Sequence, residues 1–326
     1  MKNILVIGAG ACGSALANLI CNNLHNVFLS ANKKEIVDEI NQKNTNQKFL
    51  PQAVLSSNIK AIEGFENKIK ECDLVFIACP SSAVIEVFNQ ISSLNISNEI
   101  GFVICSKGLD SNSLSFFSEV FENIFPSNNL AILSGPNFAI EIANKAPSIT
   151  TIASTNYDFA NEVIGVLNND FFSAKYSKSP VFAEVCGVIK NIMAIGCGII
   201  DGLNLGQNTK AALVNKGIEE ILLLCEALKI ETDLTTPACF GDIFLTCASS
   251  KSRNNALGAM LASGKGYAEI SKENHKTFEG AIAAKSMVNL AKKLKIELIL
   301  SQTIAQILDS SYNTDKIKNL IIKAIF

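Results

Sequence analysis

One short segment of the chain combines residue types that bind anions. Residues 249–258 read SSKSRNNALG and contain Arg253, the only arginine among 28 basic residues. A guanidinium presents a rigid, planar fork of donors, which grips a phosphate or a carboxylate in a bidentate way that lysine cannot. Ser252 is a favourable N-cap, so Arg253 and Asn254 would lie in the first turn of a helix, beside free backbone N–H groups. We predict a phosphate clamp here; a chance surface arginine, or one in an ion pair, is the alternative.

A second candidate is a lysine inside an apolar helical segment. The segment PVFAEVCGVIKNIMAIGCGII (180–200) has two charged residues, Glu184 and Lys190, which are six positions apart and so do not pair along a helix. A lysine desolvated here would have its pKa lowered towards neutrality, as a general acid or base needs. A lysine whose stem carries the ammonium to the surface is the alternative. Small residues share the predicted face of the lysine and leave room for another chain or a small ligand: Ala183, Cys186, Gly187, Ala194 and Cys197.

A carboxylate in a similar setting follows in the sequence. Asp242 is the only acid in the apolar stretch CFGDIFLTC (239–247). A carboxylate of this kind can orient a lysine or a substrate hydroxyl. We therefore predict Lys190 and Asp242 as the catalytic residues.

A glycine motif begins directly after the first apolar run, NILVIG (3–8). Gly8, Gly10 and Gly13 have the spacing G-x-G-x-x-G, and a helical segment starts at about Ala11. In a dinucleotide site the first glycine makes the turn, the second admits the pyrophosphate and the third packs the helix on the strand. The N-terminus of the helix supplies donors for the phosphates. The motif predicts dinucleotide binding, with an incidental glycine-rich turn as the alternative.

The end of the second apolar run bears on the choice of nucleotide. Domains that prefer NAD place an acid about 20 residues after the glycines, for the ribose 2′-hydroxyl. This chain has Ser30, Ala31, Asn32, Lys33 and Lys34 there, two cations and no acid. We expect NADP(H), with Lys33 as a contact, while NAD(H) stays open. The alternative is that both lysines only open a solvated helix.

The elements that must carry these residues change in character near residue 178. Short apolar runs alternate with helical segments up to that point, as in an α/β domain with a parallel sheet, and the pattern is helical afterwards. We predict a Rossmann-type, doubly wound sheet domain at 1–178 and an all-helical substrate domain at 179–326. The expected strands are 3–8, 26–30, 74–78, 101–105, 130–133, 148–153 and 171–177. The expected C-terminal helices are 180–200, 209–228, 253–263, 279–294 and 314–324.

Composition narrows the class of protein. A chain of 326 residues favours two domains. The formal net charge of −2 does not indicate the excess of basic residues that is typical of a nucleic-acid-binding protein. His25 and His275 are isolated, and no two of the ten cysteines have C-x-x-C spacing, so no metal site is expected. Most cysteines lie in apolar runs, which favours buried thiols in a reducing compartment over disulfides. Neither a signal-peptide pattern nor an uninterrupted apolar run of about 18 residues is present, so we expect a soluble cytoplasmic protein.

Several motifs carry a resemblance to a known family. The chain resembles the bacterial-type NAD(P)-dependent glycerol-3-phosphate dehydrogenases nearly from end to end. The resemblance implies reversible reduction of dihydroxyacetone phosphate to sn-glycerol 3-phosphate, which supplies glycerophospholipid synthesis. Many of these enzymes are dimers, so a homodimer is a further expectation. The matching motifs are GAGACGSALA, ACPSSAV, SKGLD, LSGPNFAIEIA, VIKNIMAIGCGIIDGLNLGQNTKAAL, FGDIFLTCASSKSRN and FEG at 278–280.

The resemblance also assigns roles to residues. It implies that Lys190 donates and accepts the proton. Residues implied to contact the substrate are Lys107, Gly135, Asn137, Lys190, Asp242, Ser252, Arg253 and Asn254. The glycine motif, the cation at 33 and the resemblance together predict these cofactor contacts: Gly8, Gly10, Ala11, Cys12, Gly13, Lys33, Lys107, Ala139, Arg253 and Glu279.

Two departures and two rival functions accompany this reading. The family usually has a tryptophan at the position of Cys12 and a serine or threonine at the position of Asn137. A reductase of a non-phosphorylated keto acid such as ketopantoate would share the sheet domain, the helices and the lysine. A non-catalytic dinucleotide sensor would need neither Lys190 nor the clamp at 252–254.

Overall fold

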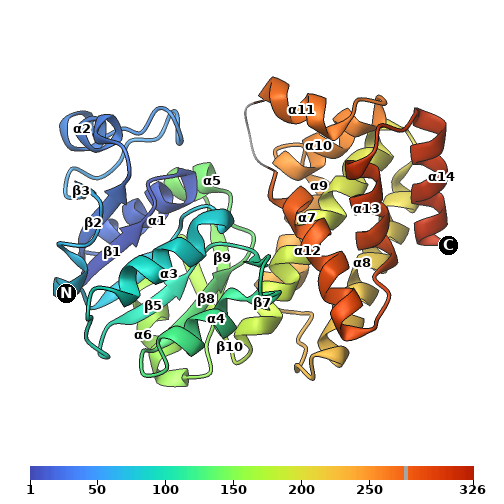
Figure 1. Cartoon of the computed structure of the whole chain (residues 1–326). Coiled ribbons are helices and arrows are strands. Elements are labelled where there is room, and N and C mark those ends of the chain that lie inside the picture. Colours follow the sequence, from blue (N-terminus) through green and yellow to red (C-terminus); the bar gives the residue numbers. More distant parts are fainter. Residues whose placement is uncertain (275–277) are drawn as a thin grey trace. The chain divides into compact units, whose positions relative to one another are not determined.

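The chain folds into two compact units. The computed structural model describes residues 1–274 and 278–326, so that His275 lies outside the described residues (Figure 1). The first unit contains residues 1–110 and 115–183, and the second contains 111–114 and 184–326. The division falls within a helix, shortly after the change in sequence pattern at residue 178.

The main sheet of the first unit confirms the predicted Rossmann-type fold. Its central strands are buried, apart from half-buried Asn3 at the start of one of them, because helices cover both of its faces. Every predicted strand is present. Within the described part of the chain the sheet has eight strands, in the spatial order β10 (Phe172–Ser177), β9 (Ser148–Ala153), β8 (Leu130–Ser134), β5 (Gly101–Ile104), β4 (Leu74–Ile77), β1 (Asn3–Ile7), β2 (Asn26–Ala31) and β3 (Lys60–Glu63).

The sheet departs from the expected parallel arrangement at one edge. Strand β9 pairs antiparallel with β8, and β10 then pairs parallel with β9. The connection from β8 to β9 contains only the five-residue helix α5 (Ala139–Ala143). Such a helix is about 7 Å long, whereas a six-residue strand is about 20 Å, so the helix alone does not span the length of the sheet as a crossover helix does.

The connections of the sheet place the helices of the first unit. The chain moves from β1 to β2 in one direction and from β4 to β5 in the other, so right-handed crossovers put α1 and α3 on opposite faces. Helix α4 contacts α3, while α5 and α6 contact α1 (Figure 1). A short hairpin, β6 (Leu109–Asp110) with β7 (Ser115–Phe116), precedes α4. The other helices are α1 (Ala11–Asn22), α2 (Lys34–Lys43), α3 (Val84–Ser92), α4 (Phe117–Ile124) and α6 (Tyr157–Leu167).

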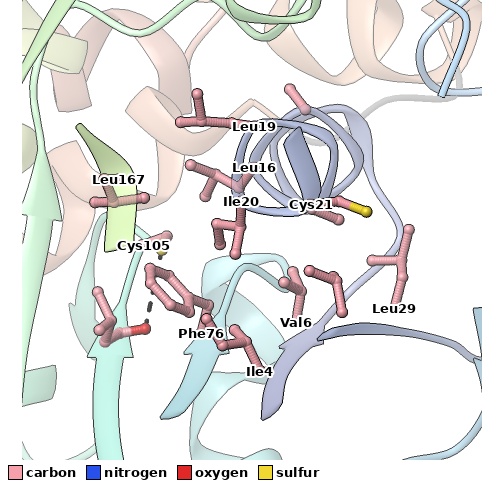
Figure 2. Packing of buried hydrophobic residues seen from close by; sticks show 14 of the residues in the cluster. Ile4, Val6, Leu16, Leu19, Ile20, Cys21, Leu29, Phe76, Cys105 and Leu167 are labelled. Atoms are coloured by element: carbon pink, nitrogen blue, oxygen red, sulfur yellow. Dashed lines mark hydrogen bonds between the residues drawn. The ribbon is translucent and has the colours of Figure 1, made fainter. Parts of the chain in front are cut away.

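The packing of α1 on β1 fixes the start of the glycine motif. Figure 2 shows Ile4 and Val6 of β1 below Leu16 and Ile20 of α1, with Leu19 on the same helix, and all five are buried. Alternate residues of a strand share one face, as do helical residues three or four apart. Full burial of each of these side chains contributes about 1.5–3 kcal/mol. The N-terminus of α1 is thereby held over the carboxyl end of β1.

The second unit is helical wherever the structure describes it, apart from its loops. The five predicted helices are confirmed, with ends within two or three residues of those expected. The sequence did not indicate α9, α11 or α13. The elements are α7 (Pro180–Gly202), α8 (Gln207–Ala227), the π-helical segment η3 (Pro237–Gly241), α9 (Asp242–Ala248), α10 (Arg253–Ala262), α11 (Tyr267–Asn274), α12 (Glu279–Leu294), α13 (Ile299–Asp309) and α14 (Thr314–Ile325).

Helix α7 is the core of the second unit. It is long and apolar enough to cross a membrane by length and composition alone, but its most apolar stretch is entirely buried inside the protein. A Cβ at Gly198 would collide with the carbonyl oxygen of Asn255, and one at Gly258 with that of Ile195. Helices α7 and α10 therefore cross with their backbones in contact.

Candidate functional site

The glycine motif forms the turn that its spacing predicts. Gly8 has φ +111°, a conformation that other residues rarely adopt, and its N–H donates to Ser30 O at 3.1 Å. A Cβ at Gly13 would collide with Gly8 O, so the helix and the turn approach too closely for any side chain there. Gly10 is the N-cap of α1, and nothing lies within 4 Å of where its Cβ would be. The loop thus leaves open space beside the start of α1, where Ala11 is the first helical residue.

The loop lies where the strand order reverses. β1 and β4 are neighbours from which the chain moves in opposite directions, and open α/β sheets bind ligands outside the carboxyl ends of such strands. A Cβ at Gly8 would lie 2.8 Å from Ala78 O, which follows β4. Half-buried Lys107 stands on the loop that follows β5. The geometry suits a bound dinucleotide.

The predicted 2′-phosphate region contains two exposed lysines that differ in their surroundings. Lys34, the first residue of α2, forms an ion pair with Asp38 at 3.3 Å, four positions along the helix. Lys33 is the N-cap residue of α2, and among the described residues it makes no ion pair. Of the two cations, Lys33 therefore has the less compensated charge.

The predicted residues after β8 are tied to β9. Asn137 donates from Nδ2 to Ile149 O at 3.0 Å and accepts at Oδ1 from Thr150 Oγ1 at 2.8 Å. A Cβ at Gly135 would lie 2.9 Å from the Cα of Thr150. Ala139, the first residue of α5, packs against the core beside α1. The amide of Asn137 therefore anchors its own loop, and contact of this loop with a substrate stays a prediction.

Most of the cysteines are buried, as predicted. Only Cys12 is exposed and only Cys79 is half-buried. Burial raises the pKa of Cys79 to about 11 and that of Cys105 well above its usual range. These two thiols are therefore protonated at neutral pH. Cys12 lies in the first turn of α1, where the resemblance led us to expect a tryptophan, and its side chain is exposed.

The second unit brings the two predicted catalytic residues together. The ammonium of Lys190, a residue that is 6% exposed, donates to Asp242 Oδ1 at 2.5 Å. It also donates to Thr246 Oγ1 at 3.0 Å, and this hydroxyl donates to Asp242 Oδ1 at 3.3 Å. The lysine therefore does not carry its charge to the surface. Burial of two charges is compensated here by their close pairing and by the added hydrogen bonds.

Thr246 was missed by the sequence reasoning. It follows Asp242 by four residues on α9, so both side chains lie on the same helix face. The spacing was visible in the stretch DIFLT, but no helix was predicted over α9. A threonine four positions after the only acid of an apolar stretch is the signal that could have identified it.

A second chain of contacts links three helix segments. Asn191, the residue after Lys190, accepts at Oδ1 from Asn254 Nδ2 at 2.9 Å. Asn254 Oδ1 in turn accepts from Gly280 N at 3.1 Å, at the start of α12. The amide of Asn254 thus joins α7, α10 and α12. Half-buried Glu279 lies in the first turn of α12, next to this junction.

The predicted anion clamp has the expected local structure. Ser252 caps α10, with Oγ accepting from Asn255 N at 3.3 Å, so Arg253 and Asn254 occupy the first turn. The first N–H groups of a helix have no acceptor within it. Arg253 is exposed and makes no ion pair with any residue that the structure describes. The alternative of a surface ion pair is therefore not observed.

The predicted site residues fall into two groups, one in each unit. Among the described residues, no group of three or more His, Cys, Asp or Glu side chains could hold a metal ion. The first unit holds Gly8, Gly10, Ala11, Cys12, Gly13, Lys33, Lys107, Gly135, Asn137 and Ala139, and the second holds Lys190, Asp242, Ser252, Arg253, Asn254 and Glu279.

The fold and these groups define a nucleotide-dependent oxidoreductase of the Rossmann class with a helical second domain. Residues 3–160 match the family model of the NAD-dependent glycerol-3-phosphate dehydrogenase N-terminus, and residues 180–319 match that of the C-terminus. The chain belongs to the NAD-dependent glycerol-3-phosphate dehydrogenase family.

Relatives cover nearly the whole chain. The glycerol-3-phosphate dehydrogenase [NAD(P)+] of Leptospira biflexa is 34% identical over 309 residues, which are 93% of this chain and 92% of the relative. That of Francisella tularensis is 35% identical over 303 residues, 92% of this chain and 90% of the relative. The crystal structure of glycerol-3-phosphate dehydrogenase from Coxiella burnetii has a TM-score of 0.92 and 29% identity, and covers 99% of this chain and 98% of that one.

Proposed function

We propose that this protein reversibly reduces dihydroxyacetone phosphate to sn-glycerol 3-phosphate with NAD(P)H. The observation that carries the proposal is the buried ion pair of Lys190 and Asp242, in a chain that belongs to the family of these dehydrogenases. A buried charge pair is costly unless it has a use or very good compensation. Family membership favours this function over reduction of a non-phosphorylated keto acid and over a sensor without catalysis.

The first unit would hold the cofactor. A nicotinamide nucleotide supplies a hydride for the carbonyl carbon when it is bound. The open space at Gly10 and the free N–H groups at the start of α1 suit its pyrophosphate. We further propose a preference for NADP(H), because Lys33 lacks an ion-pair partner among the described residues at the place where a 2′-phosphate would lie.

The start of α10 would hold the substrate phosphate. The Arg253 guanidinium would grip two phosphate oxygens, and the N–H groups of the first turn would donate to the third. Ser252 keeps this turn in place by capping it. An unphosphorylated substrate would leave these donors without a partner, so the clamp supports selection of the phosphorylated ketone.

Lys190 would handle the proton of the reaction. Its ammonium donates one proton to the ketone oxygen as the hydride adds to the carbon, which yields the secondary alcohol, and it accepts the proton in the reverse direction. Asp242 and Thr246 hold Nζ by 2.5 and 3.0 Å contacts. Proton transfer by a positioned group typically contributes a factor of about 10² to 10⁴.

The test is a parallel assay of substrates and cofactors. Oxidation of NADPH and NADH would be followed with dihydroxyacetone phosphate, dihydroxyacetone and ketopantoate. Turnover confined to the phosphorylated ketone supports the proposal, and the better cofactor decides the role of Lys33. Turnover of ketopantoate would overturn the phosphate clamp, and nucleotide binding without any turnover would point to a sensor.

Two further expectations stay proposals. The resemblance favours a cytoplasmic protein and a homodimer. Light scattering coupled to size-exclusion chromatography measures the mass in solution, against 35.0 kDa for one chain. Fractionation of cells that produce the protein measures its location.

A further inference from the structure

The segment between α2 and β3, residues 44–59, contains no helix or strand and yet is held firmly along α1. Its apolar residues Leu50, Ala53 and Leu55 are part of the buried core. Hydrogen bonds of three kinds join it to α1 and the glycine loop: those of Asn46 with Ala9 and Ser14, that of Ser56 N with Asn18, and that of Cys21 Sγ with Ser56 Oγ. Asn46 lies in an ordinary loop and is 0% exposed.

The amide of Asn46 contacts the glycine loop directly. Nδ2 donates to the carbonyl oxygen of Ala9 at 2.9 Å and to Ser14 Oγ at 2.9 Å. A carbonyl oxygen only accepts, so the nitrogen of the amide must face Ala9. Asn46 Oδ1 has no hydrogen-bond partner among the described residues, although it is buried. In this orientation the amide oxygen of Asn46 is unsatisfied, while the amide nitrogen makes both contacts at the loop.

This contact fixes the direction of one peptide group. The peptide between Ala9 and Gly10 is trans, so its C=O and N–H point in opposite directions. Asn46 holds the C=O on the buried side. The N–H of Gly10 is consequently directed away from Asn46. Separately, nothing lies within 4 Å of the place of a Cβ on Gly10, so the loop has open space at this residue.

We infer that Asn46 is a positioning residue for dinucleotide binding, which holds the Ala9–Gly10 peptide so that its N–H meets the pyrophosphate. The inference rests on the proposed function. Asn46 does not itself touch the nucleotide; it acts through the loop. Gly8 and Gly10 flank Ala9, and glycines allow many backbone conformations. Without the hydrogen bond from Asn46, the Ala9–Gly10 peptide could therefore adopt other orientations.

A matched control is available on the same segment. Asn18 of α1 is also buried, and its Oδ1 accepts from Ser56 N at 2.8 Å, which ties residues 44–59 to α1 without contact to the glycine loop. An Asn18→Ala variant therefore weakens the attachment of the segment and leaves the Ala9 carbonyl in place. Any effect of looser packing alone would be the same in both variants.

The experiment is to measure the Kd of NADPH by fluorescence for the whole protein and its variants, together with melting temperatures. Asn46→Ala removes the Nδ2 donor together with most of the side chain. Asn46→Asp removes the donor but keeps the volume of the side chain, so this variant can be measured if Asn46→Ala does not fold. Both should raise the Kd and the KM of the nucleotide by about 10- to 100-fold. In each variant the buried carbonyl of Ala9 loses its hydrogen-bond donor, and the N–H of Gly10 is no longer held in one direction. The kcat at saturating nucleotide and the KM of dihydroxyacetone phosphate should stay near wild type, and Asn18→Ala should bind NADPH as the wild type does.

The outcomes separate this inference from the proposed function. Binding by Asn46→Asp within twofold of wild type would overturn the inference alone, as would an equal loss of binding in Asn18→Ala. A wild-type protein that binds neither NADPH nor NADH would overturn the proposed function, and the inference with it.

Discussion

Asn254 Nδ2 donates to Asn191 Oδ1 at 2.9 Å, so the first turn of α10 is tied to the residue next to Lys190 on α7. This hydrogen bond therefore connects the helix start that is proposed to hold the phosphate with the residue that follows the proposed proton donor. Asn254 also fixes Gly280 at the start of α12. The buried amide of Asn254 therefore joins the three helices α7, α10 and α12 of the second unit, which carry residues of the proposed site.

Replacement of Lys190 should remove proton transfer and leave nucleotide binding intact. We expect Lys190→Ala to lose about 10²- to 10⁴-fold in kcat, because the variant lacks the proposed proton donor. The measurement is steady-state turnover, with the Kd of NADPH as the control for folding. A variant that keeps more than about a tenth of wild-type turnover would exclude Lys190 from this role.

The ion pair should be visible in stability as well. Lys190→Met leaves the carboxylate of Asp242 buried without its partner, which typically costs about 3–5 kcal/mol of unfolding free energy. The double variant Lys190→Met/Asp242→Asn removes both charges and should recover most of that loss. Urea unfolding of the three proteins measures this. Equal stability of the single and double variants would show that the charge of Asp242 is not the cause.

Replacement of Arg253 by lysine keeps the charge and removes the planar fork. Charged hydrogen bonds are worth about 1.5–3 kcal/mol each, so the KM of dihydroxyacetone phosphate should rise about 10- to 100-fold. The melting temperature should not change, because Arg253 is exposed and has no ion pair among the described residues. An unchanged KM would mean that the single arginine of the chain does not bind substrate.

The two lysines at the start of α2, the N-cap Lys33 and the first helical residue Lys34, should differ in their effect on cofactor choice. Lys33→Ala should raise the KM of NADPH severalfold and leave that of NADH unchanged, since only NADPH carries the 2′-phosphate. Lys34→Ala serves as the matched control, because Lys34 is already paired with Asp38 at 3.3 Å. The effect of Lys33 should fall as salt rises from about 0.01 to 0.15 M, as surface charges are screened. Equal effects of the two variants, or an effect on both nucleotides, would contradict a 2′-phosphate contact.

A buried carboxylate in the second unit should make stability depend on pH. Burial raises the pKa of Glu220 above its ordinary value of 4.5, and hydrogen bonds from Ser301 and Leu300 lower it by less. The folded protein then binds more protons than the unfolded chain between 4.5 and the raised value, so stability falls as pH rises through this range. The free energy of unfolding of Glu220→Gln should lack this part of the slope. A wild-type curve parallel to that of the variant between pH 4.5 and 7 would contradict the shift.

The fold was predictable where the signal is local. Continuous apolar runs identified the buried strands, and Ser252 identified the start of α10, because capping depends on residues within one turn. Strand β3 was missed because KAIE is short, half polar and at the edge of the sheet. The reversal of β9 was missed because strand direction depends on the path that the connection takes through space, which apolar runs do not report.

The site was predictable residue by residue but not contact by contact. Asp242 was expected to orient a lysine or a hydroxyl, and the structure shows the lysine, 52 positions away in the sequence. The second partner, Thr246, depends on a helix that the sequence did not indicate. Asn46 carries no motif at all, and its contact with Ala9 joins residues 37 positions apart. Such contacts exist only once the chain has folded.

The crossing of α7 and α10 at Gly198 and Gly258 has a consequence for substrate length. Backbones in direct contact, with no side chain between them, cannot slide or rotate without collision. The backbone contact at these two glycines therefore fixes the distance between the main chain at Lys190 and the start of α10. In the proposed site, adaptation to a longer or shorter substrate would therefore have to come from the side chains of Lys190 and Arg253, because the main chain of the two helices is held in place.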